Sequence, residues 1–257
     1  MRVARTFFLL GFLISAHGYL YSADQRDVLF QVSTIGSLLK GLYDGNMSCG
    51  ELKQHGDFGL GTFDHLDGEM IVVDGMVFQI RSDGKALPVP DGITTPFAVV
   101  TFFDRDSSMV LERPMDYVNL QHFLDTSIQT RNIPYALKIE GKFTYMKTRS
   151  VPKQNKPYLP LVEVIKVQPV FQFRDVPGVM VGFRSPDYLE GVNVPGYHFH
   201  FITDDRSAGG HVLECLIERV IITIDGTPNF FMALPEDDTF FQTDFGEKAN
   251  AAGIKME

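Results

Sequence analysis

Hydrophobic residues recur along most of this chain in short runs with the character of β-strands. Apolar runs rich in β-branched and aromatic residues occupy 69–73, 76–80 and 96–103, and short runs of this kind are typical of strands. The first two runs are separated only by Asp74-Gly75, a dipeptide that favours a two-residue hairpin turn. The pattern therefore predicts a β-hairpin here and a further strand after it.

A helical period is clear in two segments. Apolar residues in 33–43 and 116–131 recur every three or four positions, which is the spacing of one face of an α-helix. In the first segment Ser33 or Thr34 is available as the N-cap and Gly45 as the stop. The second segment is predicted to form the longest helix; its apolar positions are Leu120, Phe123, Leu124 and Ile128.

Strand patterns return in the second half of the chain. They predict strands at 136–145, 161–167, 170–173, 212–224 and 230–234. Because strands predominate and the helices are few and scattered, we expect an α+β protein with two layers of mixed, largely antiparallel β-sheets. Connectivity is weakest around 150–168, so we expect an N-terminal sheet-rich α+β domain over 24–160 and a C-terminal β-rich domain over 161–257.

The first residues have the pattern of a secretory signal peptide. Arg2 and Arg5 precede an apolar run over 6–16 that is too short to span a bilayer as a helix. Small residues offer a cleavage site after Gly18. We therefore expect a signal peptide within 1–23, a secreted or periplasmic mature protein, and no stable membrane anchor. An uncleaved anchor and a buried N-terminal strand are the alternatives.

The composition limits the classes of partner. The chain has 257 residues, of which 44% are apolar, enough to bury a substantial core. Its formal net charge is −9, and it has no Lys/Arg cluster that could form a basic stripe, so nucleic acid is excluded as a partner. Cys49 and Cys215 are its two cysteines; one disulfide and two free thiols both remain open.

The most informative chemistry lies in 198–211, which holds His198, His200 and His211. Side chains on a strand alternate between faces, so the His-Phe-His spacing puts the first two imidazoles on one face. The polar segment 204–210 is typical of a turn and can fold the next strand back, so that His211 faces the same place. Three neutral imidazoles with a fourth position left open are typical ligands of catalytic zinc. The spacing therefore predicts a Zn²⁺ site.

Other interpretations of this motif remain open. A single histidine on a strand is more often a half-buried residue than a metal ligand. Cupin-like metal oxygenases or isomerases usually place a glutamate shortly after the His-x-His, where this chain has Thr203, Asp204 and Asp205. Carbonic-anhydrase-like enzymes separate the third histidine by a much longer gap. A non-enzymatic secreted β-domain with a structural metal is a further alternative, and a fourth protein ligand should then close the site.

Short motifs spread from about residue 28 to the C-terminus resemble the α-acetolactate decarboxylase family. The motifs are Leu29-Phe30-Gln31-Val32-Ser33-Thr34, Gly59-Leu60-Gly61-Thr62-Phe63, Leu66-Asp67-Gly68-Glu69-Met70, Pro96-Phe97-Ala98 and Pro195-Gly196-Tyr197-His198-Phe199-His200. Their combination is far more specific than the histidines alone.

The resemblance implies a zinc-dependent carboxy-lyase that converts 2-acetolactate to acetoin and carbon dioxide in the acetoin (butanediol) pathway. It also implies three metal ligands, which are His198, His200 and His211. The further active-site residues that it implies are Glu69, Arg149, Glu257 and Thr62.

The chemistry of decarboxylation fits these residue types. Loss of carbon dioxide next to a ketone leaves an electron pair that must become an enolate, and with an adjacent hydroxyl the product is an enediolate. A dication bound to the ketone and hydroxyl oxygens would stabilise that charge, and a positioned glutamate or an arginine-held water would return the proton. We expect a small-molecule substrate as the partner. The oligomeric state is left open, with a homodimer as one expectation.

Overall fold

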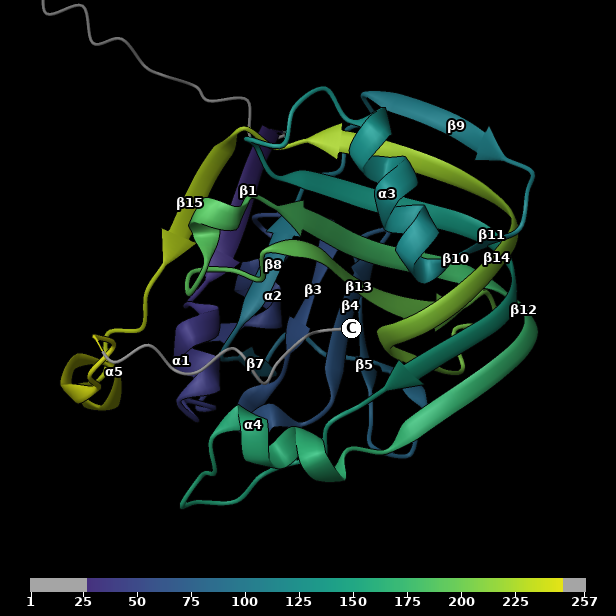
Figure 1. Ribbon diagram of the computed structural model, residues 1–257. Helices are drawn as coiled ribbons and strands as arrows, with labels where there is room; N and C mark the ends of the chain where they lie inside the picture. The colour runs from purple at the N-terminus through teal and green to yellow at the C-terminus, as the bar shows by residue number, and fades with distance from the viewer. Residues whose placement is uncertain (1–26, 247–257) are drawn as a thin grey trace, which may run out of the picture.

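Two β-sheets packed face to face form the body of the protein (Figure 1). The structure is a computed structural model, and it describes residues 27–246. The first sheet has seven strands, in the spatial order β15 (Asn229–Ala233), β1 (Val28–Val32), β8 (Ala98–Thr101), β3 (Phe58–Thr62), β4 (Glu69–Val73), β5 (Met76–Ile80) and β6 (Ala86–Pro88). Only β15 and β1 run parallel in this sheet; its other pairs are antiparallel.

The second sheet has longer strands and partly closes on itself. Its strands are β10 (Met115–Asp116), β14 (Gly209–Gly226), β11 (Tyr135–Arg149), β12 (Val170–Ser185) and β13 (Gly196–Thr203), with β9 (Ser107–Leu111) paired to β14. Because β13 also pairs with β14, the strands β11, β12, β13 and β14 form a closed cycle of antiparallel pairings. A separate two-stranded ribbon joins β2 (Met47–Ser48) to β7 (Thr94–Thr95).

The helices are short and lie around the sheets. They are α1 (Ile35–Leu39), α2 (Cys49–Leu52), α3 (Tyr117–Ser127), α4 (Leu161–Val164) and α5 (Asp238–Gln242), with single 3₁₀ turns at Asp64–Leu66, Ile165–Val167 and Asp187–Leu189. The side chain of Thr34 caps α1, and that of Asp116 caps α3. In Figure 1, α3 covers the outer face of the second sheet. The expected fold class, α+β with largely antiparallel sheets and few helices, is confirmed.

Alternation along the strands divides the buried residues into distinct clusters. One cluster lies between the sheets and combines Leu60 and Ile71 of the first with Val181 and Ile202 of the second. A second cluster fills the space between the second sheet and α3, and it includes Phe199 and residues of α3 itself. Neighbouring residues of β13 therefore face different cores, as a strand buried on both faces requires.

The predicted strand over 161–167 is wrong, because this segment forms α4 and a 3₁₀ turn. Its β-branched composition favoured a strand. Leu161 and Val164 are instead buried together in the core between the sheets, and residues three apart share a face in a helix but not in a regular strand. Pro160 occupies the N-cap position. Burial of one helical face outweighs strand propensity over so short a segment.

Sheet membership does not change at the predicted boundary near residue 160. Strand β11 precedes it yet belongs to the second sheet, whereas β15 follows it and belongs to the first. The division into domains at that point stays a prediction. The signal peptide within 1–23 and Glu257 lie outside the described residues. Cys49 and Cys215 are both buried free thiols.

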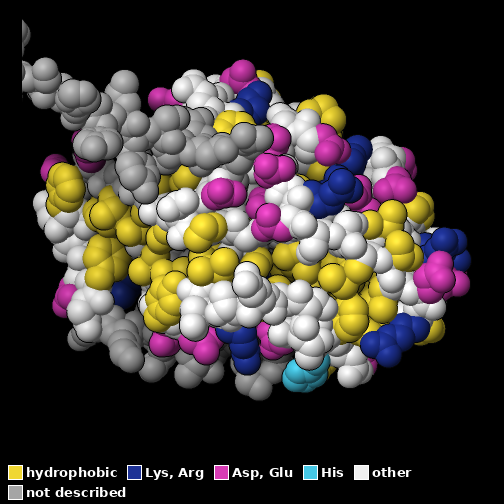
Figure 2. Space-filling model, turned by 90° about the horizontal axis from the view of Figure 1, so that it is seen from above, with side chains coloured by type: hydrophobic (Ala, Val, Ile, Leu, Met, Phe, Trp, Pro, Cys, Tyr) yellow, Lys and Arg dark blue, Asp and Glu magenta, His cyan; other side chains and the backbone are white. Residues whose placement is uncertain are grey.

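Hydrophobic side chains also reach the surface. Figure 2 shows a band of them across the face seen from above, with acidic side chains beside it. Large exposed side chains of this kind occur on β9, α3 and β14, where Val110 is 58%, Val118 60% and Ile221 47% exposed. Within the part of the chain that the structure describes, no helix is long and apolar enough to cross a membrane. The expected homodimer stays a prediction.

Candidate metal centre and active site

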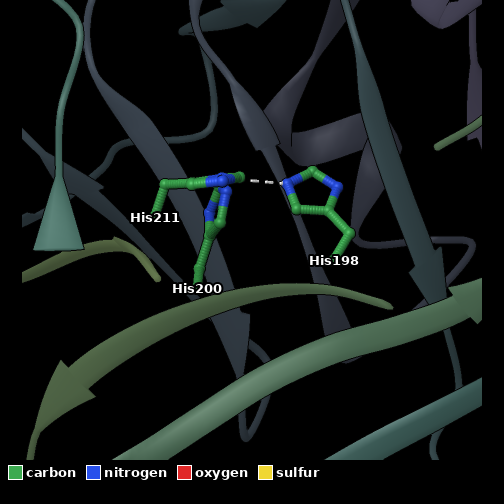
Figure 3. A group of neighbouring side chains, drawn as sticks. All are labelled: His198, His200 and His211. Atoms are coloured by element: carbon green, nitrogen blue, oxygen red, sulfur yellow. Dashed lines mark hydrogen bonds between the residues drawn. The ribbon is translucent and has the colours of Figure 1, made fainter. Parts of the chain in front are cut away.

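The three histidines predicted from the sequence meet at the base of the β13–β14 hairpin. His200 and His211 are direct partners across the ladder, and His198 precedes His200 by one alternation on β13. All three are buried, with exposed fractions of 8% for His198, 1% for His200 and 3% for His211. Figure 3 shows their rings turned toward one another. The predicted convergence is confirmed.

The nitrogen atoms of this cluster are close enough to share one ion. The ring centroids of the three pairs lie 4.9, 5.0 and 5.2 Å apart, and one nitrogen of each ring lies within 4.8 Å of the others. His198 Nε2 and His211 Nδ1 are 3.2 Å apart and share a hydrogen bond. Three imidazole donors at such distances suit tetrahedral or open zinc-type coordination.

A β-bulge turns His211 toward the site. Val212 and Cys215 face the same core beneath α3 although they are three positions apart, because the pairing with β11 skips Leu213. Regular alternation from Cys215 would have directed His211 into that core as well. The extra residue reverses the alternation and directs His211 to the inner face, where His200 lies.

The two glycines before His211 allow three strands to meet. A Cβ atom on Gly209 would lie 2.1 Å from the carbonyl oxygen of Phe201 on β13. A Cβ atom on Gly210, whose φ is +141°, would lie 2.4 Å from the carbonyl oxygen of Arg149 on β11. Strand β14 can therefore pass between β13 and β11 only without side chains here. The segment that looked like the end of a turn is part of β14.

Glu69 and Arg149 lie beside the histidines, as the family resemblance implied. Glu69 opens β4 and Arg149 ends β11, with exposed fractions of 6% and 8%. Arg149 Nη1 donates a hydrogen bond to Glu69 Oε1 at 3.1 Å, and Glu69 Oε2 is 3.5 Å from His200 Nε2. The two sheets thus contribute one carboxyl group, one guanidinium and three imidazoles to a single buried site.

A backbone carbonyl sets the tautomer of His200. Its Nδ1 lies 2.8 Å from the carbonyl oxygen of Met70, and because a carbonyl only accepts, Nδ1 must carry the proton. The lone pair of the neutral ring is then on Nε2, which is the arrangement of a metal-ligating histidine oriented from behind. No sequence motif could have identified this contact, since it is made by a backbone atom.

Burial controls the protonation of the site. It lowers the pKa of His200 to about 3 and lowers the pKa of His198 and His211 well below the ordinary value, with the nearby Arg149 adding to the effect. Burial raises the pKa of Glu69 to about 7, against the opposing influence of Arg149. Burial also lowers the pKa of Arg149, which Glu69 partly offsets. Neutral imidazoles are the form that binds metal.

The site fits a metal ion on its own geometry. His200 Nε2 is fully buried and has no hydrogen-bond partner, and such an orphaned atom costs free energy unless something occupies it. One ring nitrogen of His200 lies within 4.8 Å of a nitrogen of His198 and of His211, and the three rings face one another (Figure 3). A dication would satisfy this nitrogen together with the other two rings.

Thr62 and Glu257 are the remaining predicted site residues, and the structure describes only the first of them. Thr62 is buried and faces Glu69 across the β3–β4 ladder. Its hydroxyl donates to the carbonyl oxygen of Gly68 at 2.7 Å, so it stabilises the turn that leads into Glu69. A catalytic role for Thr62 stays a prediction, as does one for Glu257.

Sequence reasoning did not identify a second group of potential ligands, formed by Asp44, Asp64 and His65. All three side chains are half-buried. Tyr158 donates to Asp44 at 2.8 Å and also contacts His65, and Lys156 pairs with Asp44 at 2.6 Å. Asp64 and His65 belong to one 3₁₀ turn and Asp44 to a separate loop, so no local motif marks the group. The lysine already balances the carboxylate, which leaves the histidine cluster as the better metal site.

Known proteins resemble this chain over nearly its whole length. The family model described as Alpha-acetolactate decarboxylase matches residues 29–247. An alpha-acetolactate decarboxylase of Methanosarcina mazei is 50% identical over 236 residues, covering 92% of this chain and 82% of the relative. One of Bacillus subtilis strain 168 is 42% identical over 227 residues, covering 88% and 89%.

Solved structures agree with the sequence comparison. The crystal structure of alpha-acetolactate decarboxylase from Bacillus subtilis strain 168 superposes with a TM-score of 0.87 at 41% identity, covering 89% of this chain and 98% of that one. A Staphylococcus aureus protein of unknown function, described as similar to alpha-acetolactate decarboxylase, gives 0.85 at 30% identity and covers 90% of this chain. The chain therefore belongs to the alpha-acetolactate decarboxylase family and is a decarboxylase.

Proposed function

We propose that this protein converts 2-acetolactate to acetoin and carbon dioxide, as a zinc-dependent enzyme of the acetoin (butanediol) pathway. The observation that carries the proposal is the buried cluster of His198, His200 and His211 beside the Arg149–Glu69 pair, in a chain of this family. The substrate is inferred from the names of the relatives given above, and the residues of the site suit the decarboxylation of such a substrate.

Zinc is the proposed metal because the reaction needs charge stabilisation and no electron transfer. A zinc ion held by the three histidines would act as a Lewis acid toward the substrate oxygens. Neutral nitrogen ligands favour zinc over magnesium or calcium, which prefer oxygen. Metal analysis of the purified protein tests this choice, and iron in place of zinc would contradict it.

The residues of the site divide the remaining work between them. Arg149 is a fixed cation beside the cluster, so its guanidinium is suited to hold the substrate carboxylate and the negative charge that follows its loss. Glu69 lies between Arg149 and His200, where its carboxyl group can deliver a proton to one face of the enediolate. Their burial excludes bulk water from that step.

Glu257 is proposed as a second carboxylate that bonds the substrate hydroxyl. Support comes from the family resemblance and from the spacing of Ile254 and Met256, which alternate with polar neighbours as in an extended apolar strip. General acid–base help of this kind contributes ~10²–10⁴-fold. Deleting 254–257 should lower kcat at least ~10-fold while zinc content stays constant, and Glu257→Gln should reproduce much of that loss. Full-rate turnover by the truncated enzyme would show that the carboxylate lies elsewhere.

The direct test is incubation of the mature protein with racemic 2-acetolactate. Acetoin and carbon dioxide should form in equal amounts, and turnover should stop when the metal is chelated. Decarboxylation of another 2-oxo or 3-oxo acid with acetolactate left unchanged would contradict the proposed substrate.

A further inference from the structure

Two buried hydroxyl groups flank Arg149, and the proposed reaction uses neither. Thr148 and Ser150 are both 0% exposed. Thr148 Oγ1 donates to the carbonyl oxygen of Gly209 at 2.9 Å. Ser150 Oγ donates to the carbonyl oxygen of Ile80 at 2.7 Å. The residues immediately before and after Arg149 are thus each fixed by a buried hydrogen bond.

The two hydroxyl groups reach different parts of the site. Gly209 lies two positions before the candidate ligand His211 on β14. Ile80 ends β5 and is the direct partner of Glu69 across the β4–β5 ladder. One bond therefore reaches the strand that carries a metal ligand, and the other reaches the strand that supports the carboxylate.

The bond from Ser150 has no counterpart in the sheet pairings. Strand β11 belongs to the second sheet and β5 to the first, and these two strands do not pair with one another anywhere in 27–246. The Ser150–Ile80 bond therefore crosses between the sheets, at the point where Arg149 must meet Glu69. It joins the residue after Arg149 to the ladder partner of Glu69, in addition to the His200–Met70 bond between the same two sheets.

The bond from Thr148 lies where β14 has no room to shift. A Cβ atom on Gly210 would come within 2.9 Å of Thr148 Oγ1 and 2.4 Å of the Arg149 carbonyl. Just beyond, the pairing of Thr148 with Val212 follows the bulge that directs His211 inward. The hydroxyl of Thr148 thus fixes the backbone at Gly209, two residues before His211, from the face of the sheet opposite the histidine cluster.

We propose that Thr148 and Ser150 are positioning residues: Thr148 holds His211 in its metal-binding position, and Ser150 holds Arg149 against Glu69. The assignment rests on the proposed metal-dependent decarboxylation. Hydrogen bonds behind a ligand typically change metal affinity 10–100-fold, whereas misplacement of a charged group by about 1 Å can cost ~10²-fold in turnover. The two residues should therefore affect different measured quantities.

The test compares Thr148→Val, Ser150→Ala and the control Thr223→Val, a buried threonine on the distant part of β14. Zinc affinity is measured by competition with a chromogenic chelator, and kcat and KM are measured with saturating zinc. Thr148→Val should lower zinc affinity at least ~10-fold. Ser150→Ala should lower kcat at least ~10-fold with zinc affinity unchanged. Thr223→Val should change neither quantity.

A second pair of variants separates the effect of the Thr148 hydroxyl group from the effect of side-chain packing. Thr148→Ser and Thr148→Ala both remove the methyl group and differ only in the hydroxyl, so the serine should retain zinc affinity and the alanine should lose it. This pair also replaces Thr148→Val if that variant does not fold. Wild-type zinc affinity in Thr148→Ala, or wild-type kcat in Ser150→Ala, would overturn the proposal. Zinc affinity is measured without substrate, so failure of wild-type protein to decarboxylate acetolactate would refute the function separately.

Discussion

Arg149 and Glu69 form the one arginine–carboxylate ion pair inside the candidate site, among the residues that the structure describes. Both side chains are nearly inaccessible to solvent, so each charge depends on the other and on whatever binds between them. A buried pair of this kind contributes little to stability by itself. Its position beside three buried histidines is therefore better explained by chemistry than by folding.

The planar fork of Arg149 is expected to matter as much as its charge. Arg149→Lys keeps the cation but cannot donate in parallel to Glu69 and to a substrate carboxylate. We predict that this variant loses at least ~10-fold in kcat/KM. The control is Arg219→Lys, at a side chain that is 73% exposed, which should keep wild-type kinetics. Equal kinetics in both variants would contradict a role for Arg149 in the site.

At the residue scale, the sequence supported some assignments better than others. The spacing of His198, His200 and His211 predicts a metal site unaided, because strand alternation and turn chemistry are local properties. Glu69 and Arg149 are 80 positions apart, and no local rule joins them, so only the family resemblance pointed to both. The Met70 carbonyl could not be predicted at all, since every residue carries one.

At the scale of elements, the position of His211 depends on irregular features of β14. The glycine pair at 209–210 lets the strand pass between its neighbours, and the bulge at Leu213 then reverses the alternation of faces. Both features interrupt a regular ladder and so weaken it locally. Such irregularity is common where a strand must direct a functional side chain.

Gly210 is the position at which this geometry is easiest to break. Gly210→Ala would place a Cβ atom 2.4 Å from the Arg149 carbonyl at a φ of +141°. We predict a loss of about 1–3 kcal/mol in the free energy of unfolding and a drop of at least ~10-fold in zinc affinity. Urea titration and chelator competition measure the two effects.

Gly92→Ala is the matched control for that variant. A Cβ atom on Gly92 would meet nothing within 4 Å, so stability and zinc affinity should both stay at wild-type values. If Gly210→Ala also behaved as wild type, the close approach of β14 to β11 could not be what positions His211.

Elements defined by local signals were predicted well. The β4–β5 hairpin follows from its Asp-Gly turn, and α3 follows from its apolar spacing, although it ends at Ser127 rather than near Arg131. Segments decided by distant contacts were not. Strand β12 runs over Val170–Ser185, far beyond the predicted 170–173, because it pairs along nearly the whole length of β11. Helix α4 was not predicted because its buried residues pack against residues that are distant in sequence.

At the scale of the whole molecule, the site depends on two sheets whose strands come from both halves of the chain. β15 returns to pair with β1, although the two are about 200 residues apart. The histidines come from one sheet and Glu69 from the other. No sequence pattern predicts this interleaving, because it is produced by packing of complete sheets rather than by local preference.

Asp225 gives the whole fold a predicted dependence on pH. It is fully buried at the end of β14, and burial, with nearby Asp106 and Asp27, raises its pKa to about 8 from the ordinary 3.8. The folded state therefore binds this proton more tightly than the unfolded state. This tighter binding of a proton by Asp225 stabilises the folded state fully below about pH 4, and the stabilisation is lost as the pH rises toward 8.

Asp225→Asn should remove this loss of stability at rising pH, because an amide does not titrate. An amide oxygen can still accept the bond from the backbone N–H of Asp104, which is 3.2 Å from the carboxylate. We predict that the variant exceeds wild type in free energy of unfolding by about 1 kcal/mol or more at pH 8 and that the difference shrinks at pH 5. Urea unfolding at both values measures this, with exposed Asp187→Asn as the control. A constant difference between the two pH values would mean that Asp225 does not titrate in this range.

The central claim is that the histidine cluster holds the metal on which decarboxylation depends. The most direct measurement is titration of chelator-stripped protein with zinc while acetoin formation from 2-acetolactate is followed. Activity should be absent at first and rise in proportion to added zinc until one ion is bound per chain. His200→Ala should neither bind zinc nor recover activity, whereas His122→Ala, on the exposed side of α3, should behave as wild type. Full turnover by stripped protein, or normal zinc activation of His200→Ala, would contradict the account.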